Sequence, residues 1–142
     1  MALKDQNGVN RSLAEFKGKP VVVYFYPKNE TPGCVAEACS FRDSYEEFKT
    51  LGAEVVGISG DSQSSHASFA KKRRLDFVLL SDKNRIAEKA FGVPRNLFGL
   101  LPGRVTFVAD KDGKIIHTFS SGVNATKHVS ESLKVIRSIH EK

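Results

Sequence analysis

The two cysteines of this 142-residue chain, Cys34 and Cys39, are the residues best suited to covalent chemistry. Cys34 closes the segment Thr31-Pro32-Gly33-Cys34. This segment predicts the start of a helix, because threonine caps helices and proline suits the first helical position. Cys34 then lies in the first turn, where unpaired backbone N–H groups and the helix dipole favour a thiolate. Gly33 leaves room for a small reactant, so the pattern predicts a nucleophilic cysteine.

A helix terminus alone is too weak to ionise a thiol at neutral pH. An ordinary cysteine has a pKa of about 8.5 and is about 3% thiolate at pH 7. Reaching about 90% thiolate takes roughly 3.4 kcal/mol, whereas a helix terminus contributes about 0.3–1 kcal/mol and burial opposes ionisation. An arginine is therefore needed nearby, since its charge cannot be lost. Arg42, Arg95 and Arg104 are the candidates, and spacing alone does not choose among them.

Cys39 lies too far along the helix from Cys34 for a disulfide to form while the helix is intact. Five residues of helix separate the two Cα atoms by roughly 8–9 Å, against a limit of about 7 Å. A bond would require the first turns to unwind. The spacing thus suggests a switch between a folded form with a reactive Cys34 and an unwound, bridged form. The alternative is two unrelated buried cysteines, which are common in protein cores.

The segments around the cysteines predict alternating strands and helices. Val21–Tyr26 is typical of a strand buried on both faces, and the helix that follows ends before Gly52. The other predicted elements are strand Glu54–Ser59, a helix capped by Asp61 or Ser62, strand Phe77–Leu80, helix Arg85–Phe91, a hairpin of Val105–Ala109 and Ile115–Phe119, and a last helix capped by Asn124. This alternation predicts an α/β fold with a mostly parallel sheet, covered on both faces, and an antiparallel edge.

Composition excludes several other classes of protein. Hydrophobic residues make up 40% and charged residues 27% of the chain, typical of a single globular domain over residues 1–142. Two cysteines are too few for a disulfide scaffold or a structural zinc site, and no apolar run approaches the roughly 20 residues of a membrane span. The net charge is +6, and its densest run, residues 71–74, is interpreted as a solvated helix end. We therefore expect no metal, nucleic-acid or membrane partner.

The segment from Tyr26 to Cys39 resembles the active site of peroxiredoxins of the Q type, also called bacterioferritin comigratory proteins. Pro27, Thr31 and Cys34 meet the peroxiredoxin signature P-x-x-x-[TS]-x-x-C, and the form T-P-G-C-x-x-E-A-C is more specific to this subfamily. Agreement covers essentially the whole chain, through segments that include Phe41-Arg42-Asp43, Leu79-Leu80-Ser81-Asp82 and Pro102-Gly103-Arg104-Val105-Thr106-Phe107. Family members usually carry more residues before Leu3, including a short strand, so the resemblance leaves the N-terminal sheet edge undefined.

The resemblance implies a thioredoxin-like fold, with a central mixed β-sheet flanked by helices, and a thiol-dependent peroxidase without metal or organic cofactor. Cys34 would be the peroxidatic nucleophile and Cys39 the resolving cysteine. Thr31 would hydrogen-bond the thiolate and the peroxide, and Pro27 would shield the pocket. Arg104 would stabilise the thiolate and polarise the peroxide. The residues implied to bind the peroxide are Gly33, Cys34, Thr31 and Arg104.

The resemblance also implies a catalytic cycle and its partners. Hydrogen peroxide or an organic hydroperoxide would oxidise Cys34 to a sulfenic acid, Cys39 would close a disulfide within the chain, and thioredoxin or a similar dithiol would reduce it. We expect an antioxidant monomer inside the cell, in a bacterial cytoplasm or a plastid stroma.

Two alternatives on the same fold stay open. A thiol–disulfide oxidoreductase normally shows C-x-x-C at the helix start, whereas this chain has four residues between its cysteines. A redox-regulated chaperone would use the apolar loop residues Leu97, Phe98, Leu100 and Leu101. Consumption of hydrogen peroxide separates both alternatives from the peroxidase.

Overall fold

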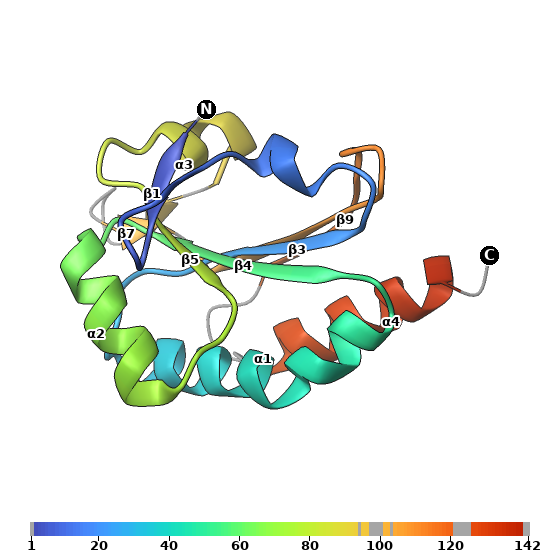
Figure 1. Cartoon of the computed structure of the whole chain (residues 1–142), viewed down its shortest axis with the longest axis horizontal. Helices are drawn as coiled ribbons and strands as arrows, with labels where there is room; N and C mark the ends of the chain where they lie inside the picture. The colour runs from blue at the N-terminus through green and yellow to red at the C-terminus, as the bar shows by residue number, and fades with distance from the viewer. Residues whose placement is uncertain (1, 94, 97–100, 103, 121–125, 141–142) are drawn as a thin grey trace.

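The computed structural model of the chain describes residues 2–93, 95–96, 101–102, 104–120 and 126–140, and its main feature is a mixed seven-stranded sheet (Figure 1). The strand order is β2-β1-β5-β4-β3-β8-β9. The strands are β1 (Leu3–Asp5), β2 (Asn10–Arg11), β3 (Val21–Phe25), β4 (Glu54–Ser59), β5 (Val78–Ser81), β8 (Val105–Ala109) and β9 (Ile115–Ser120). Strands β3, β4 and β5 are parallel, and β8 and β9 form an antiparallel hairpin beside β3. A separate pair joins β6 (Arg95–Asn96) to β7 (Leu101–Pro102).

Helices cover the two faces of the sheet unequally. The helices are η1 (Leu13–Phe16, a 3-10 turn), α1 (Pro32–Thr50), α2 (Gln63–Arg73), α3 (Ile86–Phe91) and α4 (Lys127–His140). Helices α1, α2 and α4 lie against one face, and η1 and α3 lie on the other (Figure 1). The expected central mixed sheet flanked by helices is confirmed.

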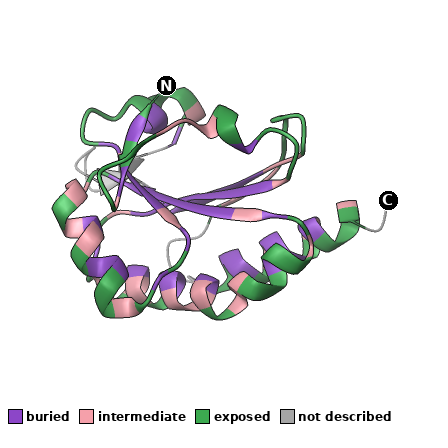
Figure 2. Cartoon of the chain, in the orientation of Figure 1, coloured by how far each residue is buried: buried purple, intermediate pink, exposed green. Residues whose placement is uncertain are grey.

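The apolar pattern of β3 explains why both faces are covered. Val22 and Tyr24 belong to the core beneath α1, whereas Val23 and Phe25 belong to the core on the opposite face. Every residue of β3 is buried, and the central strands of the sheet are mostly coloured as buried in Figure 2. The continuous apolar run therefore indicated a doubly covered strand correctly, because alternate side chains each enter a core.

Most predicted elements are present with boundaries that move by a residue or two. Ser62 is the N-cap of α2, and its hydroxyl oxygen accepts a hydrogen bond from the Ser65 N–H at 3.2 Å. Of the two predicted caps, Asp61 and Ser62, the structure therefore has Ser62. Thr31 is the N-cap residue of α1, but its side chain makes no capping bond, so that part of the prediction is wrong. The predicted cap Asn124 lies outside the described residues.

The basic run at residues 71–74 does end α2, as expected. Lys71, Lys72 and Arg73 lie in the last helical turn, where cations complement the negative pole of the helix dipole. Lys72 and Arg73 also pair with Glu30 at 3.2 and 3.1 Å, so they contact the loop that precedes α1.

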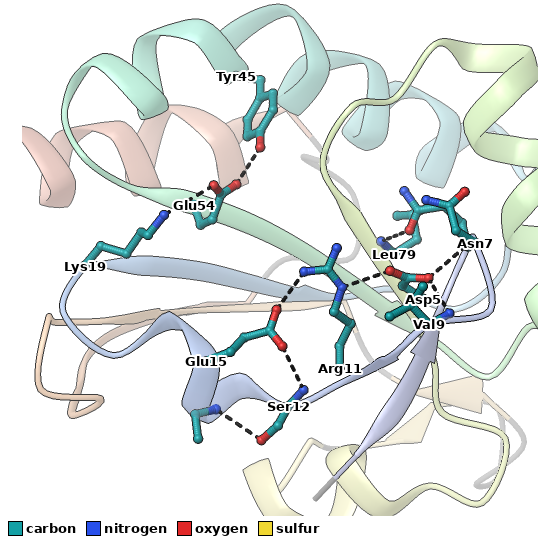
Figure 3. A network of polar contacts seen from close by, with 12 residues as sticks. Asp5, Asn7, Val9, Arg11, Ser12, Glu15, Lys19, Tyr45, Glu54 and Leu79 are labelled. Carbon is teal, nitrogen blue, oxygen red and sulfur yellow. Dashed lines mark hydrogen bonds and ion pairs between the residues drawn. The ribbon is translucent and has the colours of Figure 1, made fainter.

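Two short N-terminal strands were not predicted. β1 pairs antiparallel with both β2 and β5, so these strands occupy the sheet edge that the resemblance left undefined. Figure 3 shows the polar contacts of this hairpin: buried Asp5 accepts from Asn7 N–H at 2.8 Å, Val9 N–H at 3.0 Å and Arg11 Nε at 2.9 Å. Strands of three and two residues are too short to show a periodic pattern in the sequence. Hydrogen bonds to the Asp5 side chain hold this hairpin together instead.

Gly57 of β4 is required by the packing of Tyr24. A Cβ at Gly57 would lie 2.8 Å from Tyr24 Cζ and 2.9 Å from Leu79 Cδ2. We expect Gly57→Ala to lower the free energy of unfolding by about 1–3 kcal/mol, because overpacking displaces a fully buried ring. Urea denaturation measures the change. Gly60→Ala is the matched control, since a Cβ there meets no described atom within 4 Å, and an equal loss in both variants would refute the packing argument.

Candidate active site

The loop from β3 to α1 places Cys34 in the first turn of a helix. Cys34 is the third residue of α1, after Pro32 and Gly33, and only 1% of its surface is exposed. The Val35 N–H donates to the Thr31 carbonyl at 2.8 Å. Helix geometry leaves the N–H groups of Gly33 and Cys34 without an acceptor inside the helix. The side chain of Cys34 therefore lies at the positive pole of the helix, where two backbone N–H groups have no acceptor within the helix.

Arg104 reaches Cys34 from the neighbouring strand. β8 pairs antiparallel with β3, with Phe25 opposite Val105, so the residue before Val105 lies beside the end of β3. Arg104 Nη1 donates to Cys34 Sγ at 3.5 Å and to Glu37 Oε1 at 2.8 Å. Arg104 is only 8% exposed, so water screens these contacts weakly.

Gly33 allows the guanidinium to come this close. A Cβ at Gly33 would lie 2.8 Å from Arg104 Nη2. Any larger residue would push the guanidinium away from the helix start. Gly33, which the sequence predicted as space for a reactant, therefore also makes space for Arg104.

The other candidate arginines are placed differently. Arg42 Nη1 donates to the Arg73 carbonyl at 2.8 Å, and its Nε donates to Asp43 Oδ1 at 3.0 Å. Arg42 is thus engaged at the end of α2. The side chain of Arg95 lies outside the described residues, as do the apolar loop residues of the chaperone alternative. Of the described arginines, Arg104 is the one bonded to Cys34, while its chemical role stays a prediction.

Thr31 and Pro27 lie in the loop that leads to Cys34. The Thr31 hydroxyl donates to the Lys28 carbonyl at 2.9 Å, and within the described residues it makes no hydrogen bond to Cys34. Its oxygen can still accept a hydrogen bond from a bound reactant. Pro27 is half-buried directly after the buried Tyr26. Their predicted roles toward a peroxide therefore stay predictions.

Cys39 lies further along the same intact helix. It is half-buried, and both cysteines are free thiols. Its neighbours Ala38 and Phe41 are 1% and 0% exposed, so this part of α1 is held to the core. Since α1 is continuous from Pro32, the helix separates the Cα atoms of the cysteines by roughly 8–9 Å. This structure therefore corresponds to the predicted form with an intact helix and no disulfide between Cys34 and Cys39.

Glu37 and His128 are two buried groups that sequence reasoning did not select. Both are 0% exposed. Burial raises the pKa of Glu37 to about 8, although Arg104 acts to lower it. The second carboxyl oxygen, Oε2, lies 3.6 Å from His128 Nδ1 on α4. Glu37 could have been found from its position, because three residues after Cys34 on a helix means the same face. Nothing local in the sequence links His128 to Cys34.

A second buried network fixes the loop before Cys34. The Tyr26 hydroxyl donates to Asn29 Oδ1 at 2.6 Å, and Asn29 Nδ2 lies 3.0 Å from His66 Nδ1. His66 Nε2 lies 3.0 Å from the Leu80 carbonyl. These partners require a neutral ring that accepts at Nδ1 and donates at Nε2. Burial lowers the pKa of His66, in agreement with that neutral form.

Metal-binding clusters and membrane spans are both absent from the described part of the chain. No group of three or more His, Cys, Asp or Glu side chains there could hold a metal ion. Among the described helices, none is both long and apolar enough to cross a membrane.

The fold and the site together define a thioredoxin-like protein with a buried cysteine at a helix start and an arginine beside it. A sequence model of the AhpC/TSA family matches residues 1–118. The chain therefore belongs to the AhpC/TSA family, in its peroxiredoxin Q branch.

Individual relatives agree in sequence and in structure. The chloroplastic peroxiredoxin Q of Populus jackii is 58% identical over 137 residues, which are 96% of this chain and 64% of that protein. The chain thus spans slightly less than two thirds of that relative. The crystal structure of peroxidoxin BcpB from Mycobacterium tuberculosis is 42% identical with a TM-score of 0.91, covering 98% of this chain and 92% of that one. A bacterioferritin comigratory protein structure from Xanthomonas campestris is 30% identical with a TM-score of 0.91, covering 99% and 92%.

Arg104→Lys should reduce the reactivity of Cys34 although it keeps a positive charge. A lysine ammonium cannot reproduce the planar donor that serves Sγ and Glu37 together. In a Cys39→Ser background, we expect alkylation of Cys34 by iodoacetamide at pH 7 to slow roughly tenfold to a hundredfold, because hydrogen bonds to charged groups contribute about 1.5–3 kcal/mol. Arg42→Lys in the same background is the control. Equal rates in the two lysine variants would show that Arg104 does not activate the sulfur.

His66 should make the folded protein sensitive to acid. A histidine with a lowered pKa contributes stability above the ordinary value of 6.5, and this contribution is lost as the pH falls through the lower folded value. We expect His66→Gln to remove that part of the decline in urea midpoint between about pH 7.5 and 5. His117→Gln, on the outer strand β9, is the control. If the urea midpoint of His66→Gln declines with acid as much as that of the wild type, His66 has the same pKa in the folded and the unfolded state.

Proposed function

We propose that this chain is a thiol-dependent peroxidase that reduces hydrogen peroxide and organic hydroperoxides. The observation that supports this most directly is the guanidinium of Arg104, which donates to the sulfur of Cys34 at the start of α1. The bacterioferritin comigratory protein of Xanthomonas campestris is described as having alkyl peroxide reduction activity. The shared fold and the shared family favour the same chemistry here. On this proposal residues 1–142 act as one domain and as a monomer.

The first step is attack of the Cys34 thiolate on one peroxide oxygen. A sulfur–oxygen bond forms, the O–O bond breaks, and the sulfur is oxidised to a sulfenic acid. The leaving oxygen takes a proton and departs as water or an alcohol. Arg104 and the N–H groups of Gly33 and Cys34 would stabilise its developing negative charge. Thr31 would orient the peroxide, and Pro27 would restrict access of water.

The second step is attack of the Cys39 thiol on the sulfenic sulfur. A disulfide forms and water leaves. Since the two residues lie five positions apart in α1, the first turns have to unwind. Unwinding lifts Cys34 and Ala38 from the core, so the cost of exposing them opposes the disulfide. The oxidised form should therefore be a locally opened helix rather than a shifted rigid one.

A dithiol reductant completes the cycle by exchange. Its thiolate attacks the disulfide, and a second thiol releases both cysteines of this chain in reduced form. We propose thioredoxin or a similar protein for this role. The plant relatives are named as chloroplastic proteins, so we propose a plastid stroma, or the cytoplasm in a bacterial host, as the compartment.

Paired cysteine variants test the assignment. Cys34→Ser should abolish peroxide consumption, since no nucleophile remains. Cys39→Ser should consume one equivalent and then stall with thioredoxin as the reductant, because no disulfide can form. Mass spectrometry of the wild-type protein after one equivalent of peroxide should show a bond between Cys34 and Cys39.

Circular dichroism establishes that both variants are folded before the assay. Turnover in Cys34→Ser would rule out the proposed nucleophile. Normal recycling of Cys39→Ser by thioredoxin would leave the peroxidase in place but remove Cys39 as the resolving residue.

A further inference from the structure

One buried cation serves two buried acids at the start of α1. Arg104 Nη1 lies 2.8 Å from Glu37 Oε1 and 3.5 Å from Cys34 Sγ. Glu37 is 0% exposed and Cys34 is 1% exposed. If both acids were ionised, the cluster would carry an uncompensated negative charge away from water, which is costly. Glu37 therefore has to be neutralised, by a proton or by a second cation, if Cys34 is to be the anion.

His128 is the basic group that faces the other side of Glu37. Its Nδ1 lies 3.6 Å from Glu37 Oε2 and 2.7 Å from the Thr106 hydroxyl oxygen. In the described part of the chain Oε2 has no hydrogen-bond partner. Helix α4 packs on α1 and on β8, which brings the ring to this position. A fully buried carboxylate oxygen and a fully buried imidazole nitrogen therefore lie within ion-pair distance of each other.

The remaining groups around Glu37 do not supply this charge. Tyr24 and Tyr26 of the β3 segment are near enough to interact with it electrostatically. Burial raises the pKa of both tyrosines well above their ordinary value, so neither becomes an anion near neutral pH. Arg104 is the cation facing Glu37 from the start of β8, and its charge is shared with Cys34.

We propose that Glu37 and His128 share one proton at neutral pH and so leave the positive charge of Arg104 to Cys34. Glu37 and His128 are then positioning residues, since they act on the sulfur through Arg104. The pair is neutral overall whether the proton lies on the carboxyl or makes an imidazolium beside a carboxylate. The raised pKa of Glu37, about 8, agrees with a proton held near this carboxyl. The consequence for catalysis rests on the proposed peroxidase chemistry at Cys34.

Loss of the shared proton changes the electrostatics at the sulfur. It leaves a Glu37 carboxylate beside a neutral His128, and the carboxylate then competes with Cys34 and with the leaving oxygen for Arg104. We therefore expect the rate constant of sulfenic acid formation to rise as the thiol ionises and to decline again at alkaline pH. Rapid mixing with peroxide in a Cys39→Ser background isolates this step.

Three variants should change the alkaline decline in different ways: one should abolish it and two should shift it in opposite directions. Glu37→Gln keeps an acceptor for Arg104 but cannot ionise, so the decline should disappear. His128→Asn cannot carry the proton, so fewer protonated forms remain and the decline should move to lower pH. Thr106→Val removes a hydrogen-bond partner of Nδ1, so the proton should be held more tightly and the decline should move to higher pH.

A double variant separates positioning from mere structural damage. In Glu37→Gln, His128→Asn should have no further effect on the pH profile, since no carboxylate is left for His128 to influence. If His128→Asn instead lowers the rate equally at all pH values, or adds its full effect in the double variant, the pair does not share a proton. Should His128→Asn fail to fold, the opposite shift in Thr106→Val decides the question.

A stability measurement tests the pair without any peroxide. A carboxyl whose pKa is raised from 4.5 to about 8 keeps its proton in the folded state after the unfolded chain has released it, so stability falls as the pH rises through this window. Glu37→Gln should remove that fall in the urea midpoint. If the protein lacks peroxidase activity but shows this change, the peroxidase proposal fails and the pair remains. If turnover is normal and the change is absent, the shared proton is refuted.

Discussion

The contact between the Arg104 guanidinium and Cys34 is the interaction on which the rest of the site depends. The helix dipole contributes about 0.3–1 kcal/mol toward a thiolate, and burial of the sulfur acts against it. A permanent cation at 3.5 Å, itself only 8% exposed, is the one described group that can reverse that balance. The absence of a side chain at Gly33 is what permits the approach.

The sheet provides the rigid frame for this contact. Strand β3 ends directly before the loop to α1, and β8 begins directly after Arg104, in antiparallel register with β3. Cys34 and Arg104 are therefore brought together by one pair of hydrogen-bonded strands, although they are distant in sequence. The loop between β3 and α1 is held in place by the contact of its residue Asn29 with His66 of α2, and the buried polar atoms of the two side chains are hydrogen-bonded.

Helix α4 extends the site beyond its local sequence. It packs across α1 and β8, and it places His128 against Glu37 and Thr106. The cluster thus joins the Arg104 guanidinium to Cys34 and Glu37 directly, and to His128 and Thr106 by way of Glu37. On the proposed shared proton, a helix remote from Cys34 in sequence influences its chemistry. The cluster also explains why Glu37 tolerates complete burial: it has Arg104 on one side and an imidazole on the other.

The sequence by itself determined the local structure around Cys34 and most of the alternating strands and helices. Pro32 and Gly33 act within the first turn of α1, and the apolar run of β3 indicates a strand buried on both faces, so neighbours in the chain suffice to predict both. The choice of Arg104 over Arg42 came from the family resemblance, since spacing left them equal, and the tertiary structure supplies the contact.

Only the tertiary structure decided that the Thr31 hydroxyl bonds Lys28 rather than capping the helix, that β1 and β2 close the sheet edge, and that His128 faces Glu37. Such facts depend on strand register, helix packing and competition between nearby polar partners, and none of these is encoded in the spacing of residues along the chain.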